Sequence, residues 1–150
     1  MKISRRAFGA LAVAGAVRAQ QKDFDEQVVF AAGEGGYHTY RIPALLVTAK
    51  GTALAFAEAR KDGRGDSGAI DMVVKRSEDG GRGWSKPLVV WSDGGNTCGN
   101  PCPVVVRDSG RILLPMNLLS PVMVSGWVRT GCAWCVIPMK KQVSCVVNRN

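Results

Sequence analysis

The sequence has no acidic residue at either end. Residues 1–19 and 120–150 each carry four basic residues and no Asp or Glu, so the formal net charge of +8 comes from these two segments. Residues 20–119 carry twelve basic and twelve acidic residues. Because nucleic-acid binding requires basic residues clustered on a folded domain, the neutral centre of the chain excludes nucleic acid as a partner.

Metal ligands are also scarce. His38 is the single histidine, and we expect it to be a loop residue without a catalytic role. The five cysteines include one CxxC pair, Cys132 and Cys135, without the second pair that a zinc site of this kind requires. An odd number of cysteines allows disulfides in an exported chain and leaves at least one thiol over. We therefore expect no bound metal.

The sequence lacks an apolar run long enough to span a bilayer as a helix. Residues 1–19 instead have the pattern of a signal peptide, with Lys2, Arg5 and Arg6 before a short run of small apolar residues. The run SRRAF resembles a twin-arginine export signal. We expect export to the periplasm or the extracellular space and no stable membrane span in the mature chain. A retained N-terminal anchor is the alternative.

A helical period is missing as well. Between residues 27 and 116, short apolar runs alternate with turn residues, which predicts an all-β fold. The four strands expected from Pro43 to Trp91 have the length of one antiparallel β-propeller blade, and half of a second blade follows. The expected strands are 27–33, 43–50, 52–60, 70–77, 87–92, 102–108 and 111–117.

The run SEDGGRGW fits the pattern SxDxGxxW. In a tight turn, Ser and Asp side chains can bond to backbone N–H groups, and Gly accepts a positive φ. The pattern resembles the Asp-box of sialidases and related β-propellers, where the Trp packs under the turn. It predicts a hairpin between the third and fourth strands of the blade, but no activity by itself. The pattern is carried by Ser77, Asp79, Gly81 and Trp84.

Two upstream stretches resemble the active-site motifs of bacterial exo-α-sialidases. YRIPALL is similar to the (F/Y)RIP motif, whose arginine grips the carboxylate of sialic acid, which implies this role for Arg41. A planar guanidinium suits the task because it forms two parallel hydrogen bonds with a carboxylate. In FAEARKDGRGDSGAID, Arg60 and Asp66 match the family's pocket arginine and acid/base aspartate. The resemblance implies that Arg60 binds the sugar near its C4 hydroxyl and that Asp66 exchanges the proton.

Other roles are predicted for four further polar residues of the chain. Asp62 is the rival acid/base candidate, but its spacing from Arg60 fits less well. Asn100 stands where some sialidases carry a pocket Asp before Pro and is the third substrate-binding candidate. Glu58 could orient Arg60, and Asp71 is expected to be a structural hydrogen-bonding residue. Because these side chains would work alone on sialylated glycans or glycoconjugates, no cofactor is implied.

The resemblance covers about residues 27–119 and implies a six-bladed sialidase propeller, of which about one and a half blades are present. We expect residues 1–19 to be the signal peptide and 20–119 the N-terminal part of the propeller. Residues 120–150 show no strand-turn pattern, so we expect an aberrant or truncated tail. An ordinary strand pair of unusual composition is the alternative.

The family's Tyr nucleophile, its Glu partner and two further carboxylate-binding arginines have no match in the sequence. Three functions stay open: an exported exo-α-sialidase represented by an inactive N-terminal fragment, a propeller module that binds glycans without cleaving them, and a truncated product without function. The RIP and EAR motifs favour sialidase ancestry over a generic Asp-box protein. They also predict that Arg41, Arg60 and Asp66 converge on one concave surface.

Overall fold

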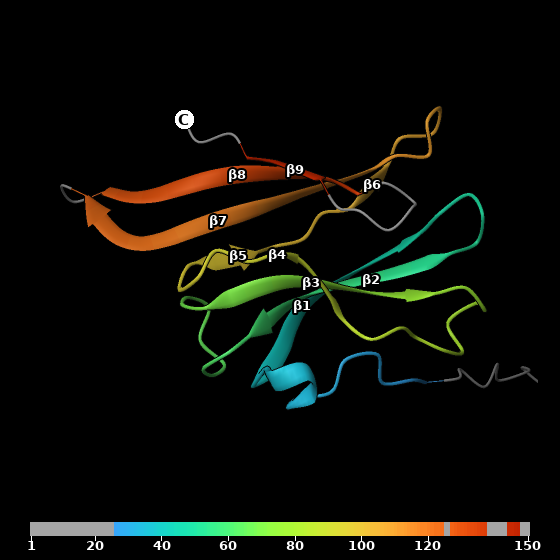
Figure 1. Ribbon diagram of the computed structural model, residues 1–150, viewed down its shortest axis with the longest axis horizontal. Coiled ribbons are helices and arrows are strands. Elements are labelled where there is room, and N and C mark those ends of the chain that lie inside the picture. Colours follow the sequence, from blue (N-terminus) through green and yellow to red (C-terminus); the bar gives the residue numbers. More distant parts are fainter. Residues whose placement is uncertain (1–25, 125–126, 138–143, 148–150) are drawn as a thin grey trace, which may run out of the picture.

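The computed structural model describes the backbone of residues 26–124, 127–137 and 144–147, and the side chains of residues 26–119. The expected signal peptide therefore lies outside the described residues. The described part is a β structure with one short 3-10 helix (Figure 1). Its elements are η1 (Glu34–Gly36), β1 (Thr39–Val47), β2 (Ala53–Arg60), β3 (Ile70–Ser77), β4 (Leu88–Trp91), β5 (Thr97–Gly99), β6 (Val104–Val105), β7 (Ile112–Val124), β8 (Trp127–Ile137) and β9 (Ser144–Val147).

Strands β1 to β4 form the antiparallel blade that the sequence predicts. β1 pairs with β2, β2 with β3, and β3 with β4, each in antiparallel register. The four strands follow one another in sequence and are joined by short connections, which is the usual arrangement of a propeller blade. The fold is thus all-β, as expected, with one complete four-stranded unit between Thr39 and Trp91.

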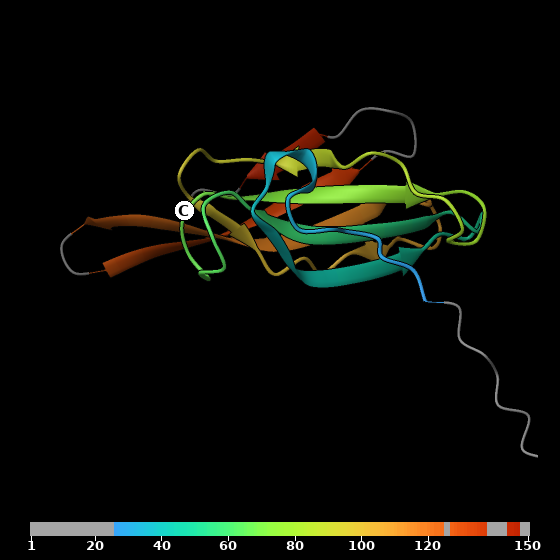
Figure 2. The same ribbon diagram turned by 90° about the horizontal axis from the view of Figure 1, so that it is seen from below.

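A second antiparallel unit begins after β5. β7 pairs with β5, β6 and β8, and β8 pairs with β9. The two units meet where β3 and β5 form one parallel bridge, Ile70 opposite Thr97. The sheet curls at this bridge, so the β7–β8 hairpin lies over β1–β3 (Figure 1). Figure 2 shows the far end of the same hairpin projecting beyond the rest of the molecule.

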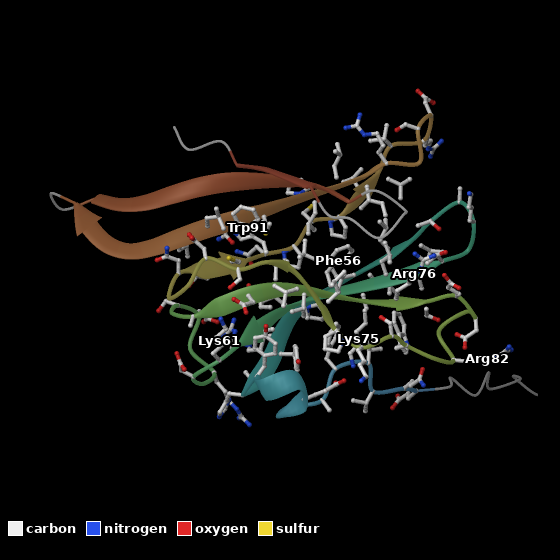
Figure 3. The ribbon with its side chains drawn as sticks, viewed as in Figure 1. Phe56, Lys61, Lys75, Arg76, Arg82 and Trp91 are labelled. Atoms are coloured by element: carbon white, nitrogen blue, oxygen red, sulfur yellow. The ribbon has the colours of Figure 1, made fainter. Side chains whose placement is uncertain are left out.

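The core lies between these two layers. Alternate residues of β2 and β3 point into it, because successive side chains of a strand face opposite sides. Phe56 is fully buried there, and Figure 3 shows it with Trp91 in the space beneath β7. The buried side chains of this cluster are Leu54, Phe56, Met72, Val74, Val90, Cys98, Ile112, Leu114 and Met116. The curl of the sheet therefore rests on apolar contacts between the two units.

The opposite face of β2 and β3 is covered by the N-terminal segment. Ala57, Ala59 and Val73 form a smaller cluster with the aromatic rings of Phe30, Tyr37 and Tyr40. The rings of Phe30 and Tyr40 lie 5.0 Å apart. Both faces of β2 are covered as a result, and all eight of its residues are buried.

Two sequence-based expectations differ from the structure. Residues 27–33 were expected to form a strand, but the structure has bends and turns there that lead into η1. Gly33, Gly35 and Gly36 all have positive φ, which breaks an extended conformation. Of residues 102–108 only Val104–Val105 is a strand, because Pro101 and Pro103, which precede it, lack backbone donors.

The last part of the chain also differs. A strand-turn pattern was not expected after Leu119, whereas β7 continues to Val124 and β8 and β9 follow it. These strands pair by backbone hydrogen bonds, which any non-proline residue can form, so the unusual composition does not prevent them. That residues 120–150 are an aberrant or truncated tail remains a prediction.

Candidate active site

The polar site lies where β2 ends. Positions 54 and 56 of β2 point into the apolar core, and the next two residues on the same face are Glu58 and Arg60. They line an open cavity of about 360 Å³ between the two sheet units. Its other polar side chains include Arg41, Asp66, Asn100 and Asn117. The four predicted residues with catalytic or substrate-binding roles are thus brought to one cavity.

Arg60 is the most deeply placed of these groups. Its side chain is almost fully buried, and its Nη2 lies 2.6 Å from Oε2 of Glu58. Its Nη1 donates to the backbone carbonyls of Arg64 and Gly65, both at 2.6 Å, and lies 2.8 Å from Oδ1 of Asp66. Burial lowers the pKa of Arg60, but the bonds to Glu58 and Asp66 outweigh burial and raise it. Arg60 therefore stays charged inside the protein.

Asp66 sits on the exposed loop that follows β2. Its Oδ1 accepts hydrogen bonds from Nη1 of Arg60 and from Nη1 of Arg41. The hydrogen bond from Arg60, followed by the charges of Arg41 and Arg60, lowers the pKa of the Asp66 carboxyl. The free site therefore holds Asp66 ionised between two guanidinium groups. Asp62, the rival candidate, is not among the described residues that line this cavity.

Arg41 reaches the cavity from an irregular part of β1. The register with β2 shifts between Arg41 and Ala44, which marks a β-bulge. Ile42 at the bulge has a φ of 51°, an unfavourable conformation for a β-branched residue. Pro43 removes one ladder donor at the same point. The bulge leaves Arg41 opposite Glu58 of β2, so the RIP sequence places its arginine beside the buried acid.

Glu58 and Asn100 are linked at the floor of the cavity. Oε1 of Glu58 accepts a hydrogen bond of 3.0 Å from the backbone N–H of Asn100. Asn100 has a φ of 53°, in the left-handed region that Asn tolerates better than most residues. A Cβ on the preceding Gly99 would lie 2.7 Å from Oε1 of Glu58, so only glycine fits there without a shift. The hydrogen bond from its backbone N–H to Glu58 therefore fixes the position of Asn100 at the cavity.

Two buried polar atoms of the cavity residues have no hydrogen-bond partner among the described residues. They are Nε of Arg60, a donor, and Oδ1 of Asn117, an acceptor. Buried polar groups are normally paired, so both atoms are candidates for a contact with a bound ligand. Asn117 was not predicted, since its place depends on the pairing of Gly99 with Asn117 between β5 and β7. No local sequence signal marks that pairing.

A second polar cluster lies on the other face of β3. Asp71 accepts hydrogen bonds from the hydroxyls of Tyr37, at 2.7 Å, and Ser92, at 2.6 Å, and lies 3.0 Å from Nζ of Lys61. Burial and then the hydrogen bond to Asp71 raise the pKa of Tyr37. These contacts agree with the structural role that the sequence predicts for Asp71. Figure 3 shows Lys61 on the side of β3 that faces η1.

Lys75 and Glu34 form another pair on this face. Nζ of the buried Lys75 lies 2.6 Å from Oε1 of Glu34 and donates to the backbone carbonyl of Val29. The hydrogen bond from Lys75 lowers the pKa of Glu34. This pair holds the N-terminal segment against β3. The local sequence does not predict it, because the two residues are 41 positions apart.

The SxDxGxxW run connects β3 to β4, as predicted. Oγ of Ser77 donates to Oδ1 of Asp79 at 2.7 Å and accepts from the N–H of Gly81 at 2.9 Å. Nε1 of Trp84 donates to the carbonyl of Gly81 at 3.0 Å. Ser77 ends β3, whereas the cavity lies at its first residue, Ile70, about 23 Å away at the usual rise of about 3.3 Å per residue. The run therefore closes the blade and does not touch the site.

No group of three or more His, Cys, Asp or Glu side chains in the described part of the chain is arranged to hold a metal ion. Within residues 26–124, 127–137 and 144–147, no helix has the length and apolar character of a transmembrane segment.

Comparison with known proteins gives one group of relatives. The chain is 38% identical over 88 residues to an exo-alpha-sialidase of Arthroderma benhamiae, which covers 55% of this chain and 22% of that protein. It is 39% identical over 80 residues to an exo-alpha-sialidase of Aspergillus fumigatus, which covers 49% of this chain and 20% of that protein. No family model matches. The chain thus spans about a fifth of the length of these relatives.

Solved structures with a similar fold include sialidases. The Hadza microbial sialidase Hz136 matches 77% of this chain and 27% of its own, with a TM-score of 0.70 and 21% sequence identity. The described sheet is therefore part of a sialidase-type β-propeller fold. Over about half of its length the chain is similar in sequence to sialidases.

Proposed function

We propose that this chain, whose relatives in sequence and fold are sialidases, is the part of an exo-α-sialidase that binds the terminal sialic acid of glycoconjugates and supplies the acid/base carboxyl. The observation that carries the proposal is the placement of Arg41, Arg60 and Asp66 around one cavity. The SxDxGxxW turn would serve as its Asp-box, and residues 1–19 would direct its export.

Arg41 is the group proposed to meet the sugar carboxylate. Its side chain is 46% exposed, whereas that of Arg60 is 3% exposed and surrounded by protein acceptors. A guanidinium at the cavity rim can turn one edge to an incoming carboxylate and form two parallel hydrogen bonds with it. The pair with Asp66 is exposed, so little free energy opposes this exchange.

The unpartnered atoms of Arg60 and Asn117 fit a hydroxylated ligand. Both atoms are buried, so a sugar hydroxyl would reach them only where the cavity side chains move apart. It would then accept from Nε of Arg60 or donate to Oδ1 of Asn117. The cavity of about 360 Å³ is in the range of small-ligand sites. An anionic, polyhydroxylated sugar matches this combination of one exposed cation, one unpartnered donor and one unpartnered acceptor.

Asp66 is proposed to be the acid/base group. In the free site both arginines hold its pKa low, so it is ionised and cannot donate a proton. A substrate carboxylate bound to Arg41 would neutralise one of the two charges and raise the pKa of Asp66. The exposed loop position leaves the carboxyl free to approach a leaving-group oxygen. Binding would thereby bring Asp66 closer to its protonated form.

These 150 residues alone support binding more readily than cleavage. The sequence has two tyrosines, and neither lines the cavity with Asp66. The hydroxyl of Tyr37 donates to Asp71, and that of Tyr40 donates to the carbonyl of Glu34 at 2.7 Å. Sialidases use a Tyr nucleophile, so hydrolysis would require one that these residues do not supply. Glycan binding without cleavage is therefore the second candidate function.

The test is titration of the purified chain with N-acetylneuraminic acid, followed by backbone amide NMR. We expect shifts at Arg41, Asp66 and Asn100, and weaker binding of the methyl ester, which lacks the carboxylate charge. A fluorogenic sialoside should not be hydrolysed at a measurable rate by the chain alone. Equal binding of acid and ester would contradict the proposed role of Arg41, and turnover would contradict the need for a further Tyr.

A further inference from the structure

The buried carboxylate of the cavity has one oxygen bonded to Arg60, at the end of its own strand, and the other to the backbone of Asn100, after β5. Glu58 is 4% exposed, and its Oε2 accepts from Nη2 of Arg60 while its Oε1 accepts from the backbone N–H of Asn100. We propose that Glu58 is a positioning residue that fixes both rims of the cavity, the Asp66 loop through Arg60 and the Asn100 turn directly. This role rests on the proposed function only for the identity of the ligand.

The first of the two links made by Glu58 is its ion pair with Arg60, which contacts the Asp66 loop. Its guanidinium is held on one side by Glu58 and on the other by three groups of one loop, the carbonyls of Arg64 and Gly65 and the carboxylate of Asp66. The base of this loop is closed by the N–H of Lys61 bonding to the carbonyl of Ala69 at 3.0 Å. Arg60 supplies three contacts to this glycine-rich loop, to which Arg41 and Thr97 also donate hydrogen bonds. The orientation of Arg60 depends in turn on Glu58.

The second link runs to Asn100. Its left-handed backbone, with a φ of 53°, directs its N–H at Oε1 of Glu58. Gly99 allows this approach because a Cβ there would lie 2.7 Å from Oε1. An Asn in the left-handed region is held by its surroundings, and a charge-assisted hydrogen bond is a strong restraint. The carboxylate of Glu58 thus bonds to the backbone of Asn100 and to the guanidinium of Arg60, and the residue is almost fully buried.

Both links of Glu58 are needed because Asp66 and Asn100 follow different strands. Asp66 follows β2, whereas Asn100 follows β5. β5 joins the blade through one parallel bridge to β3 and through hydrogen bonds between Thr97 and Gly68. A common anchor keeps the distance between the two rims constant. Arg41, on the third side of the cavity, lies opposite Glu58 in the β1–β2 register.

The direct test replaces Glu58 with Gln. The amide keeps the shape but has one oxygen and one NH2 group, so it can accept from Arg60 or from Asn100 and not from both. In the full chain without ligand, we expect hydrogen exchange of the Asn100 amide to quicken about tenfold and the amide signals of 63–67 to shift. The dissociation constant for N-acetylneuraminic acid should rise about tenfold.

Asp71→Asn is the matched control. Asp71 is also a buried, ion-paired carboxylate, on the neighbouring strand, but it faces the other side of the sheet. It should lower stability and shift the amides next to its partner Lys61, at the base of the Asp66 loop, but leave the amides of 63–67 and of Asn100 unaltered. If Glu58→Gln leaves these amides and the affinity as in the unmodified chain, or if both variants change them alike, the positioning role is wrong.

Gly99→Ala provides a second test that keeps every charge. The added Cβ must displace Oε1 of Glu58, so both loops should respond, as in Glu58→Gln. Gly95→Ala is its control, since a Cβ there meets nothing within 4 Å. If Glu58→Gln does not fold, a Gly99→Ala chain with unchanged signals at 63–67 overturns the proposal. A chain that folds but does not bind the sugar contradicts the proposed function, and the ligand-free amide measurements still decide the role of Glu58.

Discussion

Nη1 of Arg41 lies 2.9 Å from Oδ1 of Asp66, and the two side chains are 46% and 79% exposed. Ion pairs this open to solvent contribute little to stability, so a competing anion can separate them at little cost. The group proposed to bind the ligand and the group proposed to transfer the proton therefore block each other in the free site. This relationship leads to the first prediction.

Removing Arg41 should raise the pKa of Asp66. The hydrogen bond from Arg60 is the larger cause of the lowered pKa and remains in Arg41→Ala, so the value should rise but stay below the ordinary 3.8. Carboxyl carbon chemical shifts followed against pH measure this directly. An Asp66 that titrates identically with and without Arg41 would show that the pair does not form in solution.

The chain should lose stability in acid. Asp79 has a lowered pKa because the N–H of Gly83 and the hydroxyl of Ser77 bond to its carboxylate, and Glu34 and Asp66 are lowered by their cationic partners. A lowered folded-state pKa stabilises the protein above the ordinary pKa values of 3.8 and 4.5, and this stabilisation disappears as the pH falls through the folded values.

Urea unfolding midpoints measured from pH 7 down to about pH 2 will test this. The midpoint should fall on acidification, and Asp79→Asn should flatten part of that fall. A midpoint that is constant below pH 5 would contradict the carboxylate contacts described for the folded chain.

Arg60→Met should destabilise the chain strongly. It leaves the buried carboxylate of Glu58 without its cation, and breaking a buried ion pair from one side costs about 3–5 kcal/mol. The double variant Glu58→Leu/Arg60→Met should cost less than the sum of the single changes, because no lone charge remains. Chemical denaturation of the three variants measures the coupling. Additive losses would mean that the two side chains do not interact.

Cys98 should resist alkylation in the folded chain. Burial raises the pKa of its thiol to about 12, and the side chain is fully enclosed in the core. The thiolate is the reactive form, so iodoacetamide at neutral pH should modify the exposed Cys102 first. Peptide mass spectrometry resolves the two sites. Equal modification rates would show that the core between the two sheet units opens readily.

Much of the blade could be predicted from the sequence. Alternating apolar runs and turn residues predict β2 and β3 within a residue, because both strands are regular and their turns are rich in glycine. β1 begins four residues earlier than expected, at Thr39, since the pairing of Thr39 with Arg60 continues beyond the bulge. The segment 27–33 was wrongly predicted as a strand because it is a short apolar run whose one glycine, Gly33, stands at its end.

The site shows a similar division. The motifs predicted Arg41, Arg60, Asp66 and Asn100, and their roles in substrate binding and proton transfer stay predictions. The buried links of Glu58 to Asn100, Tyr37 to Asp71 and Lys75 to Glu34 join residues 34 to 42 positions apart. Such contacts depend on how the strands pair and curl, and no local pattern records them. Long-range pairing therefore decides which motif residues meet.

The central claim is that Arg41 binds an anionic sugar at this cavity, and a matched pair of arginine variants tests it most directly. Arg76 is 43% exposed and paired with Glu78 at 2.6 Å, but it lies near the far end of β3, beside the SxDxGxxW turn. The affinity of each variant for N-acetylneuraminic acid should be measured by NMR titration. We predict that Arg41→Ala weakens binding at least about tenfold, while Arg76→Ala leaves it unchanged. Equal affinities of the two variants, at the level of the unmodified chain, would contradict the account.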